Sequence, residues 1–221
     1  MPAVRRHVTY RLFATLASVA LLAVACQATG ATAIPTSAPT ATASATPSGP
    51  TDFATTTFSV PFSLVLPTGW KVSDEKPDMF TAYLSAAAGG PQVGIDIQLV
   101  PVVHTDPCNL QSGTVDSGSS AADLVAWMLA FKPLAGTAGA PVTIDGSPTL
   151  VVDEQFAGTP CENAELWPTA GGWLDAGERK RYFVFEMGGK RLVATIFSSD
   201  AGFAANVDAA RAVLGALDFR G

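Results

Sequence analysis

The chain has 221 residues, and its 13 basic and 19 acidic side chains give a formal net charge of -6 at pH 7. Three arginines and no acidic residue precede residue 26, so the rest of the chain carries 10 basic and 19 acidic side chains, a formal charge of -9. Such a charge repels phosphate backbones, and no basic stripe is long enough to bind nucleic acid by counterion release. We therefore expect no nucleic-acid function.

The N-terminus has the layout of a secretory signal. Arg5, Arg6 and Arg11 precede an uncharged run over residues 12–25, and a positive segment before a short apolar one is typical of exported proteins. At about 1.5 Å per residue the run covers about 21 Å, less than the hydrocarbon thickness of about 30 Å. A permanent transmembrane helix is therefore disfavoured.

The next residues resemble the bacterial lipobox, in which a cysteine becomes the lipid-modified first residue of the mature chain. Leu22-Ala23-Val24-Ala25-Cys26 places small residues before that cysteine, although Ala23 stands where leucine is usual. The resemblance implies a signal peptide over residues 1–25, lipidation of Cys26 and a lipid anchor at the extracytoplasmic face of the cell membrane. An ordinary signal peptide cleaved near Ala25 or Ala28 is the alternative.

Three cysteines in an exported chain leave one over unless it has another role. If Cys26 carries lipid, Cys108 and Cys161 remain, and an oxidising compartment allows them to form a disulfide. Closing a loop of about 54 residues stabilises a fold by about 4 kcal/mol in the chain-entropy model. Two separate buried thiols are the alternative.

Residues 26–52 are predicted to be the acylated cysteine and a disordered stalk. From Gln27 to Asp52 nearly every residue is Ala, Thr, Ser, Pro or Gly, and Ile34 is the single large aliphatic side chain. Such a segment buries too little apolar surface to offset the entropy of ordering it. Residues 53–221, about 170 in number, suit one globular domain with its own core.

Alternating apolar residues predict strands along the domain. The first lies within residues 58–66, as one strand or as two bent at Pro61, and residues 67–69 form a turn. Further strands are expected at 79–84 and 93–100, with a turn at Gly89-Gly90-Pro91 between them. In the second of these strands, polar and apolar residues alternate, so we expect one wet face and one buried face.

Two hairpins and two helices complete the predicted elements. The hairpins join residues 142–144 to 150–152 and residues 181–187 to 190–197, the latter through Gly188-Gly189, which readily adopt the positive φ of a tight turn. Ser119 or Ser120 caps a helix that Pro133 stops, and a second helix spans about 201–217. The order indicates an α+β fold, a single antiparallel sheet packed by a middle helix and a C-terminal helix.

The segment from Phe62 to Trp70, FSLVLPTGW, resembles the opening strand and turn of PsbP-like and LpqN-like domains. Their order of elements, an antiparallel sheet covered by a middle and a C-terminal helix, is similar to that predicted over most of residues 58–219. The resemblance implies a fold far more than a function. Its members include small lipoproteins and accessory subunits of membrane complexes, and they share no catalytic residue to carry over.

Motifs for catalysis are weak. His104 is the one histidine beyond the signal, and no Gly-x-Ser-x-Gly segment presents a nucleophile to it and Asp106. An envelope hydrolase with an unrecognised site near His104 is an alternative to a surface-loop histidine. Residues 73–76 have the Ser-x-x-Lys spacing of penicillin-recognising enzymes, but they sit in an expected polar loop and the companion motifs are missing.

No metal or cofactor is expected. Zinc requires ligands beyond one histidine and two paired cysteines. Asp74, Glu75 and Asp78 form an acidic cluster that would hold calcium only loosely, and a solvated turn is the simpler interpretation. Phosphate loops and dinucleotide fingerprints are absent from the sequence.

Basic residues at the ends of one hairpin are the first candidates for binding. Arg179, Lys180, Arg181, Lys190 and Arg191 supply half of the positive charge that remains after the signal. They would face anionic headgroups or an acidic partner. The alternative is that these charges are solvated and protect an edge strand from aggregation.

Two tryptophans in a glycine-containing loop are the second candidates. Trp167 and Trp173 follow Cys161 closely, and exposed indoles stack on sugars or peptides, whereas buried ones cap a core. Contact through these indoles would make the domain a small-molecule binding module. The leading hypothesis is a lipid-anchored protein, not an enzyme, whose domain binds or positions a protein or glycan partner in the cell envelope. Its oligomeric state is left open.

Overall fold

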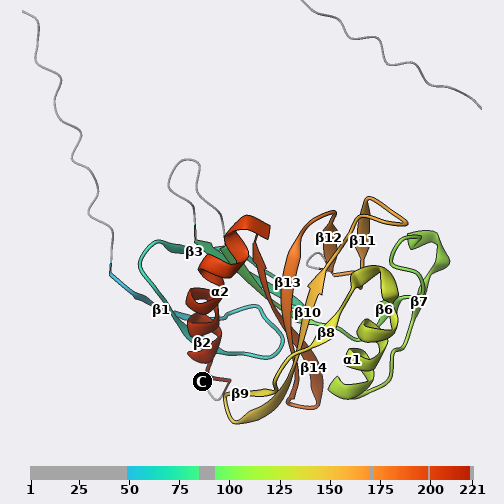
Figure 1. Ribbon diagram of the computed structural model, residues 1–221. Helices are drawn as coiled ribbons and strands as arrows, with labels where there is room; N and C mark the ends of the chain where they lie inside the picture. Colours follow the sequence, from blue (N-terminus) through green and yellow to red (C-terminus); the bar gives the residue numbers. More distant parts are fainter. Residues whose placement is uncertain (1–48, 85–92, 170–171, 199, 220–221) are drawn as a thin grey trace, which may run out of the picture. The chain divides into compact units, whose positions relative to one another are not determined.

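The computed structural model describes residues 49–84, 93–169, 172–198 and 200–219 (Figure 1). The chain divides into the units Met1–Ser44 and Ala45–Gly221, and every described residue belongs to the second. Cys26, the signal segment, most of the expected stalk and the expected turn at residues 89–91 lie outside the described residues. Within the described ranges, no helix combines the length and apolar character needed to cross a membrane.

An antiparallel sheet of eight strands forms the centre of the domain (Figure 1). Its order is β3-β4-β5-β14-β13-β10-β8, and β9 pairs with the first part of β10. The strands are β3 Trp70–Glu75, β4 Met79–Leu84, β5 Val93–Leu99, β8 Thr137–Ala138, β9 Val142–Ile144, β10 Ser147–Gln155, β13 Arg179–Met187 and β14 Lys190–Ser198.

Three small two-stranded sheets and two helices surround this sheet. The small sheets pair β1 Thr51–Ala54 with β2 Ser63–Leu66, β6 Val103–His104 with β7 Thr114–Val115, and β11 Asn163–Glu165 with β12 Trp173–Asp175. The helices are α1 Ala121–Ala130 and α2 Asp200–Gly215, and short 3-10 turns lie at η1 Leu110–Ser112 and η2 Lys132–Leu134. The predicted α+β class, with a middle and a C-terminal helix, is confirmed.

The large sheet has a hydrophobic core on each face. Phe183 and Phe185 of β13 pack into the core that contains α2, whereas Tyr182 and Val184 pack into the core that contains α1. Consecutive side chains of a strand point to opposite faces, so one strand supplies both cores. We call these the α2 face and the α1 face.

Burial on both faces corrects the expectation that β5 has a wet side. Asp96 and Gln98 alternate with apolar neighbours, yet they are 7% and 0% exposed. The α1 face of the sheet is covered, and the polar side chains of β5 are bonded within that interior. Thr81 donates a hydrogen bond to Asp96, and Trp167 donates one to Gln98.

Several local predictions are confirmed. Ser120 caps α1 and forms a reciprocal capping box with Asp123. Gly188 and Gly189 have φ of 59° and 71°, the left-handed conformation that a tight hairpin turn needs. The hairpin of β9 and β10 is also present, although β10 continues as far as Gln155.

Other local predictions need correction. Within residues 58–66 only Ser63–Leu66 is a strand, although the alternating apolar side chains are all buried. The polar segment after Trp70, expected to be a loop, is instead the edge strand β3. The first strand, β1, begins at Thr51, two residues before the expected start of the domain.

Candidate functional site

The basic residues of the β13–β14 hairpin do not form one patch. Arg179 lies opposite Ser198 at one end, and Lys190 lies opposite Met187 at the other. The eight residue steps from Arg179 to Met187 correspond to about 27 Å. Alternation along the strand further separates Arg179 and Arg181, on the α2 face, from Lys180 on the α1 face.

Arg191 is a structural arginine rather than a solvated or ligand-facing one. It is 8% exposed, and its guanidinium donates hydrogen bonds to the carbonyl oxygens of Val100 at 2.8 Å, Pro101 at 3.3 Å and Gly118. Burial lowers its pKa. Arg191 therefore fixes the loop before α1 to the end of β5.

The exposed Lys190 lines a pocket of about 340 Å³ at the hairpin turn, together with Arg191, Asp116 and Ser119. The lining holds charges of both signs, and most donors of Arg191 are occupied by carbonyl oxygens. Lys190 also donates to a carbonyl oxygen, that of Ser59 at 3.5 Å, so both cations of this lining already have backbone partners.

Trp167 is a core residue, which agrees with the alternative in which a buried indole caps the core. Its side chain is 0% exposed, and its Nε1 donates to Oε1 of Gln98 at 2.6 Å. Thr169 Oγ1 donates to the same oxygen at 2.8 Å. Trp173, in contrast, is 43% exposed, and its carbonyl accepts a hydrogen bond from the buried Lys180.

His104 is also buried, which corrects the expectation of a surface loop. Its Nε2 lies 3.5 Å from Oε2 of Glu165, whereas the carboxylate of Asp106 accepts a hydrogen bond from the backbone N–H of Cys108 at 3.0 Å. Among the described residues, no serine hydroxyl is hydrogen-bonded to His104. The geometry therefore assembles no Ser-His-Asp triad.

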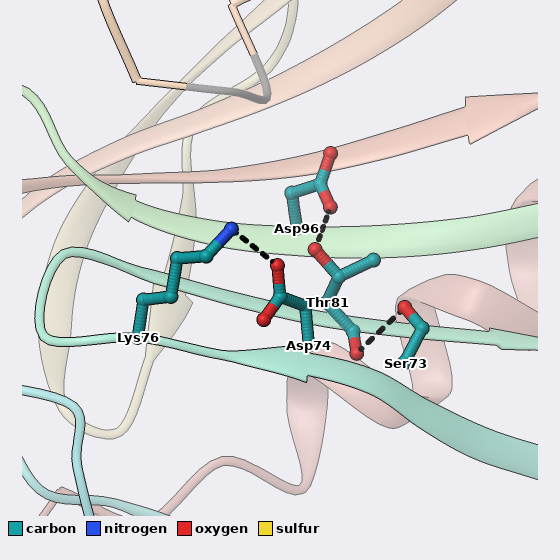
Figure 2. Close-up of polar contacts among 5 residues, drawn as sticks. All are labelled: Ser73, Asp74, Lys76, Thr81 and Asp96. Atoms are coloured by element: carbon teal, nitrogen blue, oxygen red, sulfur yellow. Dashed lines mark hydrogen bonds and ion pairs between the residues drawn. The ribbon is translucent and has the colours of Figure 1, made fainter.

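Ser73 and Lys76 engage separate partners (Figure 2). Ser73 Oγ donates to the carbonyl oxygen of Thr81 at 3.4 Å, and Lys76 Nζ pairs with Oδ2 of Asp74 at 2.5 Å. Lys76 is therefore not positioned as the base of a serine nucleophile. The same view shows the Thr81 hydroxyl directed at Asp96, with Oγ1 and Oδ1 2.7 Å apart.

Cys108 and Cys161 form the predicted disulfide, with their Cα atoms 5.5 Å apart. It joins the loop after β6 to the loop before β11. In the described part of the chain, no group of three or more His, Cys, Asp or Glu side chains is arranged to hold a metal ion.

A buried row of ionisable groups lies on the α1 face. Glu154 is 2% exposed and faces Lys180 across the β10–β13 pair. Burial raises the pKa of Glu154 to about 8, and burial also raises the pKa of Asp96, to about 6. Burial likewise raises the pKa of Tyr182 well above its ordinary value.

A pocket of about 310 Å³ occupies the α2 face beside the sheet edge. Helix α2 packs mainly against β5 and β14, so the part of this face built by β10 lies outside its main contacts. The floor is formed by Val151 and Phe183, which belong to the α2 core. We call this site the arginine pocket, and it is lined by Gly139, Ala140, Pro141, Val142, Val151, Asp153, Arg181, Phe183 and Arg211.

Two of the four arginines in the described ranges, Arg181 and Arg211, line this pocket, and Arg179 shares the contact of Arg181 with helix α2. The guanidinium carbons of Arg179 and Arg181 lie 5.5 and 6.0 Å from the ring centre of Phe203 on α2, and Arg211 lines the pocket from the same helix. Arg181 donates two hydrogen bonds to Asp153, at 2.7 and 3.1 Å. Positive charge is thus concentrated on an otherwise acidic domain.

The sequence pattern does not single out Arg211, because it stands alone in the C-terminal helix, far along the chain from the hairpin arginines. Its exposed side chain makes no hydrogen bond or ion pair with any residue that the structure describes. No short motif marks it. Only the packing of α2 on the sheet brings it to the same pocket as Arg181.

No family model matches the chain. No curated protein matches it either. A crystal structure of a protein of unknown function from Pseudomonas aeruginosa is similar at 12% identity and a TM-score of 0.40, covering 76% of this chain and 95% of that one.

Solved structures of both domain groups that the sequence resembles are also similar to the chain. Cyanobacterial PsbP from Synechocystis sp. PCC 6803 is 12% identical with a TM-score of 0.40, covering 77% of this chain and 92% of that one. LpqN from Mycobacterium tuberculosis, involved in cell envelope biogenesis, is 14% identical with a TM-score of 0.35, covering 71% and 81%. We draw no functional conclusion from similarities at this level.

Proposed function

We propose that the chain is a lipid-anchored protein of the extracytoplasmic membrane face whose domain binds or positions a partner in the cell envelope without catalysing a reaction. The lipobox-like segment before Cys26 and the Ala/Thr/Ser/Pro-rich segment after it support the anchor and the tether. The observation that carries the binding role is the arginine pocket. It places the side chains of Arg181 and Arg211 beside apolar residues of the sheet and its edge.

The arrangement of the side chains first considered for catalysis favours a binding role over a catalytic one. His104 is buried against Glu165, and Ser73 and Lys76 bond to different partners. A nucleophile and its base need to lie within hydrogen-bonding reach of each other. None of these three side chains meets that requirement with another.

The pocket favours a partner that presents an anionic group. Its lining contains two arginines, Arg181 and Arg211, and one carboxylate, that of Asp153, so an excess of one positive charge remains. The rest of the domain is acidic and repels the same partner, which directs it to this face. The envelope partner is therefore expected to dock through an acidic group at the β10 side of the α2 face.

Crosslinking of an affinity-tagged protein in its own cells tests this proposal. The wild type is compared with Arg211→Glu, which reverses the charge at the pocket, and with Lys71→Glu, which makes the same charge change on the opposite edge strand β3. We expect a partner adduct that Arg211→Glu removes and Lys71→Glu keeps. An adduct pattern that Arg211→Glu leaves unchanged would refute this pocket as the docking site.

The anchor is tested separately by fractionation. The wild type should be recovered with membranes and released by detergent, whereas Cys26→Ser should appear in the fraction without membranes. Recovery of unacylated wild type in that fraction would refute the anchor but leave the pocket's role intact.

A further inference from the structure

We infer that the arginine pocket binds a monoanionic carboxylate carried on a small apolar body. This inference rests on the proposed function, because it names the ligand chemistry of the same site. Three features of the pocket lead to it: the charge of its lining, the availability of Arg211 and the apolar floor.

The charge of the lining suits one negative charge. The lining contains two guanidinium groups, of Arg181 and Arg211, and one carboxylate, of Asp153, which leaves a net charge of +1. A carboxylate balances that charge. A phosphate monoester carries about 1.5 to 2 negative charges at pH 7, and the additional charge would be repelled by Asp153.

Arg211 is the group that is available to a ligand. Arg181 already uses Nε and Nη2 on the two carboxylate oxygens of Asp153. Arg211 has no polar partner within the described ranges. A guanidinium presents two parallel N–H groups that match the two oxygens of a carboxylate. Arg211 is therefore expected to hold the ligand, while Arg181 and Asp153 form a fixed wall beside it.

The floor of the pocket selects for an apolar group next to the carboxylate. The buried Val151 and Phe183 form the floor, and Pro141 and Val142 add apolar side chains to the lining. Burying apolar surface against them contributes about 25 cal/mol per Å². The volume of about 310 Å³ is near the lower end of the range for ligand sites, about 300 to 1,000 Å³. The apolar body is therefore expected to be a few carbons long.

The pocket is also built on rigid elements. Val151 and Phe183 are directly paired in the register of β10 and β13, and so are Asp153 and Arg181. The backbone N–H of Gly139 donates to the carbonyl oxygen of Val151 at 2.8 Å, and this close approach leaves no room for a side chain, since a Cβ at Gly139 would lie 2.8 Å from Cγ1 of Val151. A site on paired strands is preorganised, which lowers the entropic cost of binding.

Titration followed by nuclear magnetic resonance tests the inference. The protein is the full exported chain with Cys26→Ser, so that it is recovered without lipid, and the probes are hexanoate, hexyl phosphate and hexanol. We expect saturable shifts of the backbone signals of Val151, Phe183 and Arg211 with hexanoate. We expect at least tenfold weaker binding of hexanol, which lacks the charge, and weaker binding of hexyl phosphate.

Matched variants make the result specific. Arg211→Gln should weaken hexanoate binding at least tenfold, whereas Lys71→Gln, an equal loss of charge on the far edge strand, should leave it unchanged. Shifts confined to other residues, equal binding of hexanol, or tighter binding of hexyl phosphate would overturn the inference. Crosslinking to a partner that depends on Arg211, without hexanoate binding, would refute the carboxylate chemistry alone. Hexanoate binding without such a partner would refute the envelope role alone.

Discussion

Arg181 and Asp153 lie directly opposite each other on β13 and β10, and the guanidinium donates to both carboxylate oxygens, at 2.7 and 3.1 Å. Their side chains are 26% and 33% exposed. A pair this open to solvent contributes about 1 kcal/mol or less to the free energy of unfolding. Its main effect is to hold Arg181 in one orientation at the wall of the arginine pocket.

Asp153→Asn should therefore change binding more than stability. Loss of the carboxylate removes the negative charge from the pocket, so hexanoate should bind several-fold more tightly. The affinity for hexyl phosphate, which carries more negative charge, should increase by a larger factor. The free energy of unfolding, measured by urea denaturation, should fall by about 1 kcal/mol or less. Asp175→Asn, an equal change at an exposed position of β12, is the control. Weaker hexanoate binding by Asp153→Asn would contradict the assigned charge balance.

Replacement by phenylalanine should reduce the stability of the domain much more at Trp167 than at Trp173. Trp167→Phe removes the donor to Gln98 and leaves a small void in the α1 core, which should cost about 2 kcal/mol in urea denaturation. Trp173→Phe, at a position 43% exposed, should change the free energy of unfolding by about 0.5 kcal/mol or less. A larger cost at Trp173 than at Trp167 would contradict the described packing.

Glu154 should make the domain lose stability as the pH rises. Burial raises its pKa from 4.5 to about 8 in the folded domain, so the folded state holds this proton more tightly than the unfolded state. The stability present below pH 4.5 is then lost progressively up to about pH 8. Asp96, with its pKa raised from 3.8 to about 6, acts in the same direction over a lower range.

Glu154→Gln tests this linkage, because glutamine keeps the shape and stays neutral. Each unit of pKa difference corresponds to about 1.4 kcal/mol. The variant should match the wild type near pH 4.5 and become more stable by a few kcal/mol above pH 8, as measured by urea denaturation across pH. The exposed Glu162→Gln serves as the control. A difference from the wild type that does not grow with pH would show that Glu154 is already ionised in the folded domain.

The disulfide should contribute strongly to the stability of the domain. Cys108 and Cys161 are separated by 53 positions, and a loop of that length corresponds to about 4 kcal/mol in the chain-entropy model. The double variant Cys108→Ser/Cys161→Ser should therefore show a lower urea midpoint. In the native wild type, neither thiol should be alkylated before reduction, and two thiols alkylated without reductant would exclude the bond.

Local signals were enough to predict the elements that depend on short-range chemistry. Ser120 before an apolar stripe marks the start of α1, and Gly188-Gly189 marks the turn of the longest hairpin. The edge strand β3 was missed because its polar residues look like a loop. Its pairing with β4, including a register shift between Val72 and Asp74, is a tertiary property.

The site was harder to predict because it depends on which face of the sheet is covered. Alternation in β5 suggested a wet face, yet the core around α1 encloses Asp96 and Gln98. Basic residues close together in sequence were separated by strand alternation and by the length of the hairpin. Arg211, distant in sequence, was brought to Arg181 by helix packing.

The most direct test of the central claim places a photoreactive amino acid in the pocket of the anchored protein. Ala140 lies exposed on the rim of the arginine pocket, and Ala122 lies exposed on α1, which packs on the opposite face. Irradiation in intact cells should give a defined adduct from position 140 and none from position 122. The adduct from position 140 should disappear when Arg211→Glu is added. Equal adducts from both positions, or an adduct at position 140 that persists with Arg211→Glu, would contradict the claim that the domain binds its partner through the arginine pocket.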